Sequence, residues 1–121
     1  MMKKKSSGKG IFGMGKVYLN DFEELVLTAV ARLGDDAYGV KIRRTIEEVG
    51  ERFMSIGAVY STLERLEEKG LVSSWQGEPT AERGGRAKRF FRVEDVGLRA
   101  IAETHRVRRK MVEGVLGLEP S

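Results

Sequence analysis

Residues 55–76 read SIGAVYSTLERLEEKGLVSSWQ, and the spacing of their apolar side chains changes at Gly70. Before this glycine, apolar residues recur at steps of three and four, which is typical of a helix with one buried face: Ile56, Val59, Leu63 and Leu66. Ser55 is a favoured N-cap, and a lysine followed by a glycine is a favoured helix ending. After the glycine, LVSSWQ is typical of a strand. We therefore predict a helix over about 56–69 and a strand over 71–76.

The residues that follow indicate a hairpin with a long basic tip. RFFRV, at 89–93, is a second strand-like run, and residues 77–88 between the two strands contain a proline and two adjacent glycines. The tip with its flanks, about 77–89, is called the wing below. From Glu94 to about Leu116 the helical spacing returns, and the closing GLEPS is expected to fray.

A helix with a strong start signal lies upstream. Asn20 and Glu23 stand at the spacing of a capping box, with Asn in place of the usual Ser or Thr. Apolar residues then recur at steps of three and four, which predicts a helix over 21–33 that ends at Gly34.

A second helix is expected over about 37–49, with Asp35-Asp36 as its cap. Its expected apolar stripe consists of Val40, Ile42, Ile46 and Val49. Residues 1–18 are rich in Gly, Ser and Lys without a sustained period, and we expect them to form a flexible basic arm.

The expected element order is helix, helix, helix, strand, strand, helix. Two helices joined by a short turn and followed by a hairpin describe a winged helix-turn-helix. The fold class is therefore mainly α with a small β-hairpin. We expect the arm at 1–18, a winged helix-turn-helix DNA-binding domain at 19–93, and one C-terminal dimerisation helix with a frayed tail at 94–121.

Composition excludes several classes of function. The chain has no cysteine, which rules out disulfides and cysteine nucleophiles, and a single histidine argues against a metal cluster or a Ser-His-Asp triad. The longest nearly apolar run, 25–33, is far shorter than the ~20 residues of a membrane span, and the run near the N-terminus is too short for a secretory signal. We expect a cytoplasmic protein that is not an enzyme and has no catalytic residue, cofactor, metal or membrane contact.

Positive charge is concentrated in two places. The formal net charge is +4; residues 1–19 carry five lysines and no acid, and residues 71–93 carry five bases against two acids. Concentrated positive charge is expected of a protein that binds a polyanion. A solubilising tail and a solvated loop would give the same pattern, so charge alone leaves both interpretations open.

The face of the 56–69 helix opposite its apolar stripe is suited to a DNA groove. Its first turns carry small or hydroxyl-bearing side chains, which let a helix enter a major groove about 12 Å wide. The candidate contacts to phosphates and bases are Ser55, Gly57, Tyr60, Ser61, Thr62 and Arg65. Three acids near the end of the helix favour a plain surface helix instead, because DNA would repel them: Glu64, Glu67 and Glu68.

The wing supplies a second set of candidate contacts. Glycines let a backbone approach a sugar–phosphate wall closely, and arginines suit a narrow minor groove. The candidates are Arg83, Gly84, Gly85, Arg86 and Lys88. An exposed loop charged against aggregation is the alternative, but a helix-turn-helix directly followed by a basic hairpin forms a coherent reader of two grooves.

Three stretches together resemble the PadR family of bacterial transcriptional regulators: DDAYGVKIRRTIEEVG, SIGAVYSTLERLEEKGLVSS and GEPTAERGGRAKRFFRV. The resemblance spans about residues 20–97 and implies a homodimeric repressor that binds an inverted repeat in double-stranded DNA. It implies that the third helix enters the major groove, that the wing meets the minor groove, and that Tyr60 faces DNA. Glu94-Asp95 depart from the family's usual start of the last helix, and we expect Asp95 to cap it.

The resemblance to short members of the family implies that the C-terminal helix of each subunit packs on its partner's first helix. This helix has apolar residues on more than one side, which a small monomer cannot cover. The candidate interface residues are Phe22, Leu25, Leu98, Ile101, His105, Met111, Val112 and Val115. Some relatives bind flat aromatic effectors here, but residues 94–116 contain no Trp, Tyr or Phe to support such a pocket. A small-molecule effector of other chemistry is left open.

Three residues have two interpretations each. For Trp75, packing beside Phe90 or Phe91 in the hairpin is favoured over stacking on a base; Tyr38 is a candidate phosphate contact or a packing residue. For His105, an interface or surface position is favoured over a pH sensor or metal ligand. The alternative function for the whole chain is a winged-helix protein-interaction adaptor that dimerises but has no specific operator. The acidic end of the 56–69 helix favours the adaptor, whereas the wing and the lysine-rich arm favour DNA binding.

Overall fold

The structure, a computed structural model, describes residues 17–78 and 87–117. Within these residues the elements are α1 (Asp21–Leu33), the 3-10 turn η2 (Gly34–Asp36), α2 (Gly39–Gly50), α3 (Ile56–Glu68), β1 (Val72–Gln76), β2 (Arg89–Val93) and α4 (Asp95–Val112). The predicted winged helix-turn-helix with one C-terminal helix is confirmed. The arm at 1–16 and most of the wing lie outside the described residues, so the expected domain boundaries stay a prediction.

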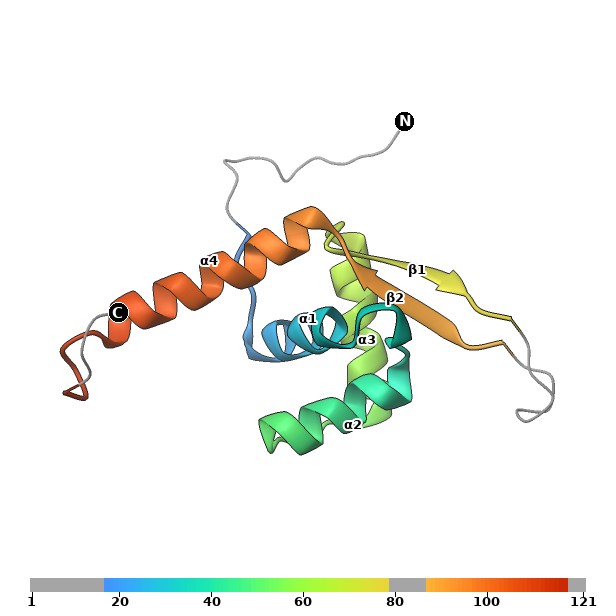
Figure 1. The fold of residues 1–121 in the computed structure, drawn as a ribbon, viewed down its shortest axis with the longest axis horizontal. Helices are drawn as coiled ribbons and strands as arrows, with labels where there is room; N and C mark the ends of the chain where they lie inside the picture. Colours follow the sequence, from blue (N-terminus) through green and yellow to red (C-terminus); the bar gives the residue numbers. More distant parts are fainter. Residues whose placement is uncertain (1–16, 79–86, 118–121) are drawn as a thin grey trace.

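One apolar core joins the first three helices and the hairpin. Its fully buried side chains include Leu27 of α1, Ile42 of α2, Leu63 of α3 and Phe91 of β2. Burial of a side chain of this size contributes roughly 1.5–3 kcal/mol. In Figure 1, α1, α2 and α3 form the body, while the hairpin and α4 extend from it in different directions.

The hairpin presents two different faces because side chains alternate along a strand. β1 pairs with β2 antiparallel, with Val72 opposite Val93 and Trp75 opposite Phe90. Val72 and Phe91 are buried, so their face packs on the helices. The other face carries Trp75 and Phe90, whose rings stack with centroids 5.6 Å apart. The hairpin packing predicted for Trp75 is therefore found, with Phe90 as its partner.

The predicted start of the second helix is wrong. Asp35 and Asp36 lie in η2 and cap nothing; α2 begins at Gly39 with Tyr38 as its N-cap and no capping side chain. Ala37 and Tyr38 are extended because they pair with β2. The Phe91 N–H donates to the Ala37 carbonyl at 2.9 Å, and Tyr38 forms a bridge with Phe90. The aspartates form ion pairs instead, Asp36 with Lys41 and Asp35 with Arg92.

Three residues assigned to apolar stripes are exposed rather than buried: Val40 at 43%, Val49 at 58% and Ile56 at 39%. Val40 lies about 200° around α2 from Ile42, since each residue turns the helix by about 100°. Val49 and Ile56 stand at helix ends, where neighbouring elements no longer cover them.

α4 is anchored at its start and extends beyond the body at its end (Figure 1). A Cβ added at Gly97 would lie 2.4 Å from the Leu71 carbonyl oxygen, so only glycine allows this close packing. Glu94, not Asp95, is the N-cap, and its side chain makes no capping hydrogen bond. The helix ends at Val112, short of the predicted Leu116, because the poor helix former Gly114 follows.

Candidate nucleic-acid interface

α3 buries one face and leaves the opposite face accessible. The Ser55 Oγ accepts a hydrogen bond from the Ala58 N–H at 3.1 Å, which confirms the predicted N-cap. Val59, Leu63 and Leu66 are fully buried against the core. The exposed side therefore carries Gly57, Ser61 and Arg65, as the sequence predicts. This face is narrow and mostly without bulky side chains in its first two turns.

Tyr60 is half-buried and packs on the start of α2. A Cβ added at Gly39 would lie 2.4 Å from the Tyr60 hydroxyl oxygen and 2.5 Å from its Cζ. Gly39 therefore provides the space in which the Tyr60 ring lies, and the ring has a fixed place at the edge of the α3 face. Sequence reasoning identified Tyr60 but not its contact with Gly39, because the contact joins two helices.

Thr62 does not belong to the exposed face. Its side chain is only 2% exposed, so the predicted contact of its hydroxyl with DNA is wrong. The reason is spacing: Thr62 lies three residues after Val59 and four before Leu66, and thus on the same side of the helix as these core residues. Its Oγ1 accepts a hydrogen bond from Arg65 Nη2 at 3.3 Å.

A buried carboxylate links the start of α1 to the end of α3. Glu23 is 3% exposed and forms the predicted capping box, in which the Asn20 N–H donates to Oε1 at 3.0 Å. Lys69 Nζ donates to Oε2 at 2.8 Å, and Arg65 Nε lies 3.6 Å from the same oxygen. Burial alone would raise the pKa of the Glu23 carboxyl, but the hydrogen bonds from Lys69 and Asn20 and the two nearby cations outweigh it, so this pKa is lowered.

The acids at the end of α3 are in part neutralised by the hairpin. Glu67 Oε1 accepts a hydrogen bond from Arg89 Nη2 at 2.7 Å, and Oε2 accepts one from the Ser74 hydroxyl at 2.9 Å. Arg89 Nε also donates to the Ser74 oxygen at 3.2 Å. This network fixes the hairpin against α3 and removes part of the repulsion that the sequence predicts between this helix end and DNA. Glu64 and Glu68 remain exposed.

The base of the wing carries a series of ring and cation contacts on its outer face. Lys88 Nζ lies 3.9 Å from the centroid of the Tyr38 ring, and Tyr38 meets Phe90 edge-on at 5.7 Å. Phe90 stacks on Trp75, and the Arg92 guanidinium lies 4.8 Å from the Trp75 ring. Tyr38 thus joins the wing to the start of α2. Four predicted contacts lie outside the described residues: Arg83, Gly84, Gly85 and Arg86.

The predicted dimer residues lie in the first half of α1, along α4 and, for Val115, just beyond the end of α4. Exposure is 42% for Phe22, 50% for Leu98, 73% for Met111 and 68% for Val115. Leu25 and Ile101 are half-buried against the monomer's own core. Arg108 ties α4 to α1 through Glu24, with Nη2 and Oε1 2.9 Å apart. His105 and Val112 are also on α4, exposed and half-buried respectively.

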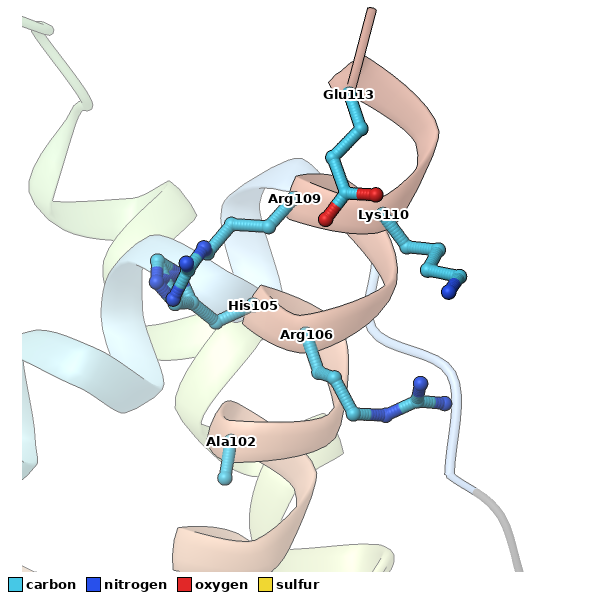
Figure 2. Close-up of a pocket in the computed structure, with 6 residues that line it drawn as sticks. All are labelled: Ala102, His105, Arg106, Arg109, Lys110 and Glu113. Carbon is cyan, nitrogen blue, oxygen red and sulfur yellow. The ribbon is translucent and has the colours of Figure 1, made fainter. Parts of the chain in front are cut away.

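The outward face of α4 is strongly basic. Figure 2 shows His105 and Arg109 extending to one side of the helix and Arg106 and Lys110 to the other, around a shallow depression. Arg106 is paired with Glu103, its Nη2 lying 2.9 Å from a carboxylate oxygen. In the described part of the chain, no three acidic or histidine side chains gather closely enough to hold a metal ion. Within the same residues, no helix is both long and apolar enough to cross a membrane.

The helix-turn-helix with its exposed α3 face and attached hairpin defines the winged-helix class of nucleic-acid-binding folds. The sequence model of the transcriptional regulator PadR-like family matches residues 26–103, well over half of the chain. The chain belongs to the PadR-like family of transcriptional regulators. No curated protein sequence matches it.

Solved structures agree with this fold. A PadR family transcription regulator from hypervirulent Clostridium difficile R20291 is 22% identical with a TM-score of 0.64, over 81% of this chain and 100% of that one. A PadR-like transcription factor from Bacteroides fragilis is 20% identical with a TM-score of 0.66, over 78% and 85%. A PadR-like regulator from Bacillus cereus ATCC 14579 is 20% identical with a TM-score of 0.62, over 80% and 92%. At such identities the likeness concerns the fold.

Proposed function

We propose that this regulator is a cytoplasmic, sequence-specific DNA-binding repressor without catalytic activity. It acts as a homodimer on an inverted repeat, with α3 in the major groove and the wing, about 77–89, at the minor groove. The observation that carries the proposal is the exposed α3 face, on which small side chains precede Arg65. A helix of this shape approaches base edges in its first turns, and arginine pairs with guanine O6 and N7.

The charge distribution supports a DNA partner. The wing and the N-terminal lysines hold the surplus of positive charge. Arg89 and Ser74 donate hydrogen bonds to Glu67, and the Arg89 charge offsets part of the negative charge at the end of α3 nearest the hairpin. Electrostatic attraction to phosphates supplies most of the non-specific affinity of such proteins, and contacts to bases add the specificity.

The homodimer is supported by apolar surface that the monomer leaves uncovered. Leu98 and Met111 of α4 are 50% and 73% exposed, and Phe22 at the start of α1 is 42% exposed. Large exposed apolar side chains on neighbouring elements are typical of an interface. Leu98→Glu is the test, because this side chain is half in solvent already: sedimentation of the variant is expected to give a folded monomer. If the wild type also sediments as a monomer, the proposed homodimer is contradicted.

Selection of the purified protein on random duplex DNA at near-physiological salt tests the main proposal. We expect enrichment of an inverted repeat whose half-site centres lie about one helical turn, ~10 bp, apart. Ser61→Ala is expected to narrow the difference in affinity between the selected duplex and a scrambled one. Binding without an enriched motif would contradict the proposal and support the protein-interaction adaptor instead.

A further inference from the structure

Arg65 is held by two side chains on one edge of its guanidinium. Its Nη2 donates to Thr62 Oγ1 at 3.3 Å, and its Nε lies 3.6 Å from Glu23 Oε2. In the planar guanidinium, Nε–H and one Nη2–H form the side edge, whereas Nη1 and the other Nη2–H form the end edge. Among the residues that the structure describes, none forms a hydrogen bond or ion pair with Nη1. The Arg65 side chain is 45% exposed.

The two groups that contact Arg65 are both buried. Glu23 is 3% exposed and is fixed by the Asn20 N–H and by Lys69. Thr62 is 2% exposed within the core side of α3. Because both groups are buried, neither is placed to contact DNA directly. A buried carboxylate and a buried hydroxyl therefore meet at the one cation of the exposed α3 face.

We propose that Glu23 and Thr62 are positioning residues for DNA recognition, which orient the end edge of the Arg65 guanidinium toward a base. This inference rests on the proposed function. A free arginine loses rotamer freedom when it binds, and immobilising such a side chain costs about 0.5–1.5 kcal/mol. Contacts that restrict Arg65 before binding reduce this cost. They also favour guanine, whose O6 and N7 accept two parallel hydrogen bonds.

Glu23 has a second effect on DNA binding, of opposite sign. Its negative charge opposes phosphates, so its removal by Glu23→Gln is expected to leave binding to random DNA unchanged or slightly tighter. The same substitution releases the Arg65 side edge and is expected to weaken binding to the selected duplex. The charge effect acts on both duplexes alike and cancels in the ratio of the affinity for the selected duplex to that for random DNA. The orientation effect lowers this ratio. A smaller fraction of folded protein lowers both affinities equally and leaves the ratio unchanged.

Glu23→Gln suits the test because glutamine still completes a capping box with Asn20. The probes are the duplex enriched by selection and a scrambled duplex of the same composition, titrated with the purified chain. We expect Glu23→Gln and Thr62→Val each to reduce the ratio of affinities about two- to tenfold, the range that the ordering cost of one long side chain implies. Glu24→Gln is the matched control, because Glu24 pairs with Arg108 of α4 rather than with α3. It is expected to leave the ratio unchanged.

A double-mutant cycle with Arg65→Gln identifies the route of the effect. If Glu23 acts by orienting Arg65, Glu23→Gln causes no further loss of the ratio in the Arg65→Gln background. A repeated selection with Glu23→Gln should lose preference at the same base positions as Arg65→Gln. An unchanged affinity ratio for Glu23→Gln, or an equal loss of the ratio with and without Arg65, would overturn the inference. The proposed function would stand in that case, because the wild type would still select its operator. If wild type selects no motif, the proposed function fails and this inference with it.

Discussion

Glu23 makes the stability of the protein depend on pH in a way that one substitution isolates. Its lowered pKa means that the folded state favours the charged carboxyl, so its contribution to stability is present above the ordinary glutamate pKa of about 4.3 and is lost as pH falls through the folded value. Glu23→Gln removes the charge and keeps the capping box. The difference in unfolding free energy between the two proteins therefore measures the ion pairs.

The structure bounds the size of this difference. Breaking a fully buried ion pair costs about 3–5 kcal/mol, and an exposed pair contributes about 0–1 kcal/mol. The Glu23 side chain is 4% exposed, but those of Lys69 and Arg65 are 40% and 45% exposed, so water screens one side of each pair. We expect Glu23→Gln to cost about 1–2 kcal/mol near pH 7, which corresponds to a fall in Tm of roughly 5–10 °C.

Urea unfolding of both proteins at a fixed protein concentration, from about pH 7 down to about pH 3.5, checks this reasoning. The difference should shrink toward the acid end, because the unfolded wild type binds a proton at Glu23 below the ordinary glutamate pKa, whereas the folded state resists binding it. Acid effects from other carboxyl groups occur in both proteins and cancel. A difference that stays constant across this range, or that grows on acidification, would refute the account of Glu23.

Three further predictions concern packing and the wing. Gly97→Ala is expected to lower the unfolding free energy by about 1–3 kcal/mol in urea titrations, since the added Cβ meets the Leu71 carbonyl. Gly57→Ala meets no atom within 4 Å and is expected to raise it by up to about 1 kcal/mol, yet to weaken binding to the selected duplex; tighter binding would argue against α3 in the groove. Tyr38→Leu should flatten the dependence of log affinity on log salt by up to about one unit, because Lys88 loses the ring that supports it, while Tyr38→Phe keeps the wild-type slope; equal slopes would contradict this role.

Local signals in the sequence predicted most of the architecture. The capping box at Asn20 and Glu23, the cap at Ser55 and the change of period after Gly70 each depend on neighbours within a few residues, and each is present in the structure. The outer face of α3 follows from the same helical geometry for Gly57 and Arg65, which are both exposed.

The errors arise where distant segments compete with local preferences. Asp35-Asp36 has the composition of a helix cap, but the pairing of Ala37 with Phe91 keeps the chain extended there. Thr62 is expected on the flank of the exposed α3 face, but it lies within about one turn of both Val59 and Leu66 and is buried with them. The spacing of Asn20 and Glu23 predicts the capping box. The contact of Glu23 with Lys69, forty-six residues further along, could not be predicted from neighbouring residues.

The stacked Trp75 and Phe90 at the base of the wing provide an intrinsic fluorescent probe of the hairpin. Trp75 is the single tryptophan of the chain, and it touches both Phe90 and Arg92 on the strand that enters from the wing tip. All tryptophan emission therefore comes from this hairpin, and a cation beside the indole makes that emission sensitive to a change of hairpin geometry. Titration with DNA can thus be followed without a label, and a spectral shift that saturates would report a change at the β1–β2 hairpin.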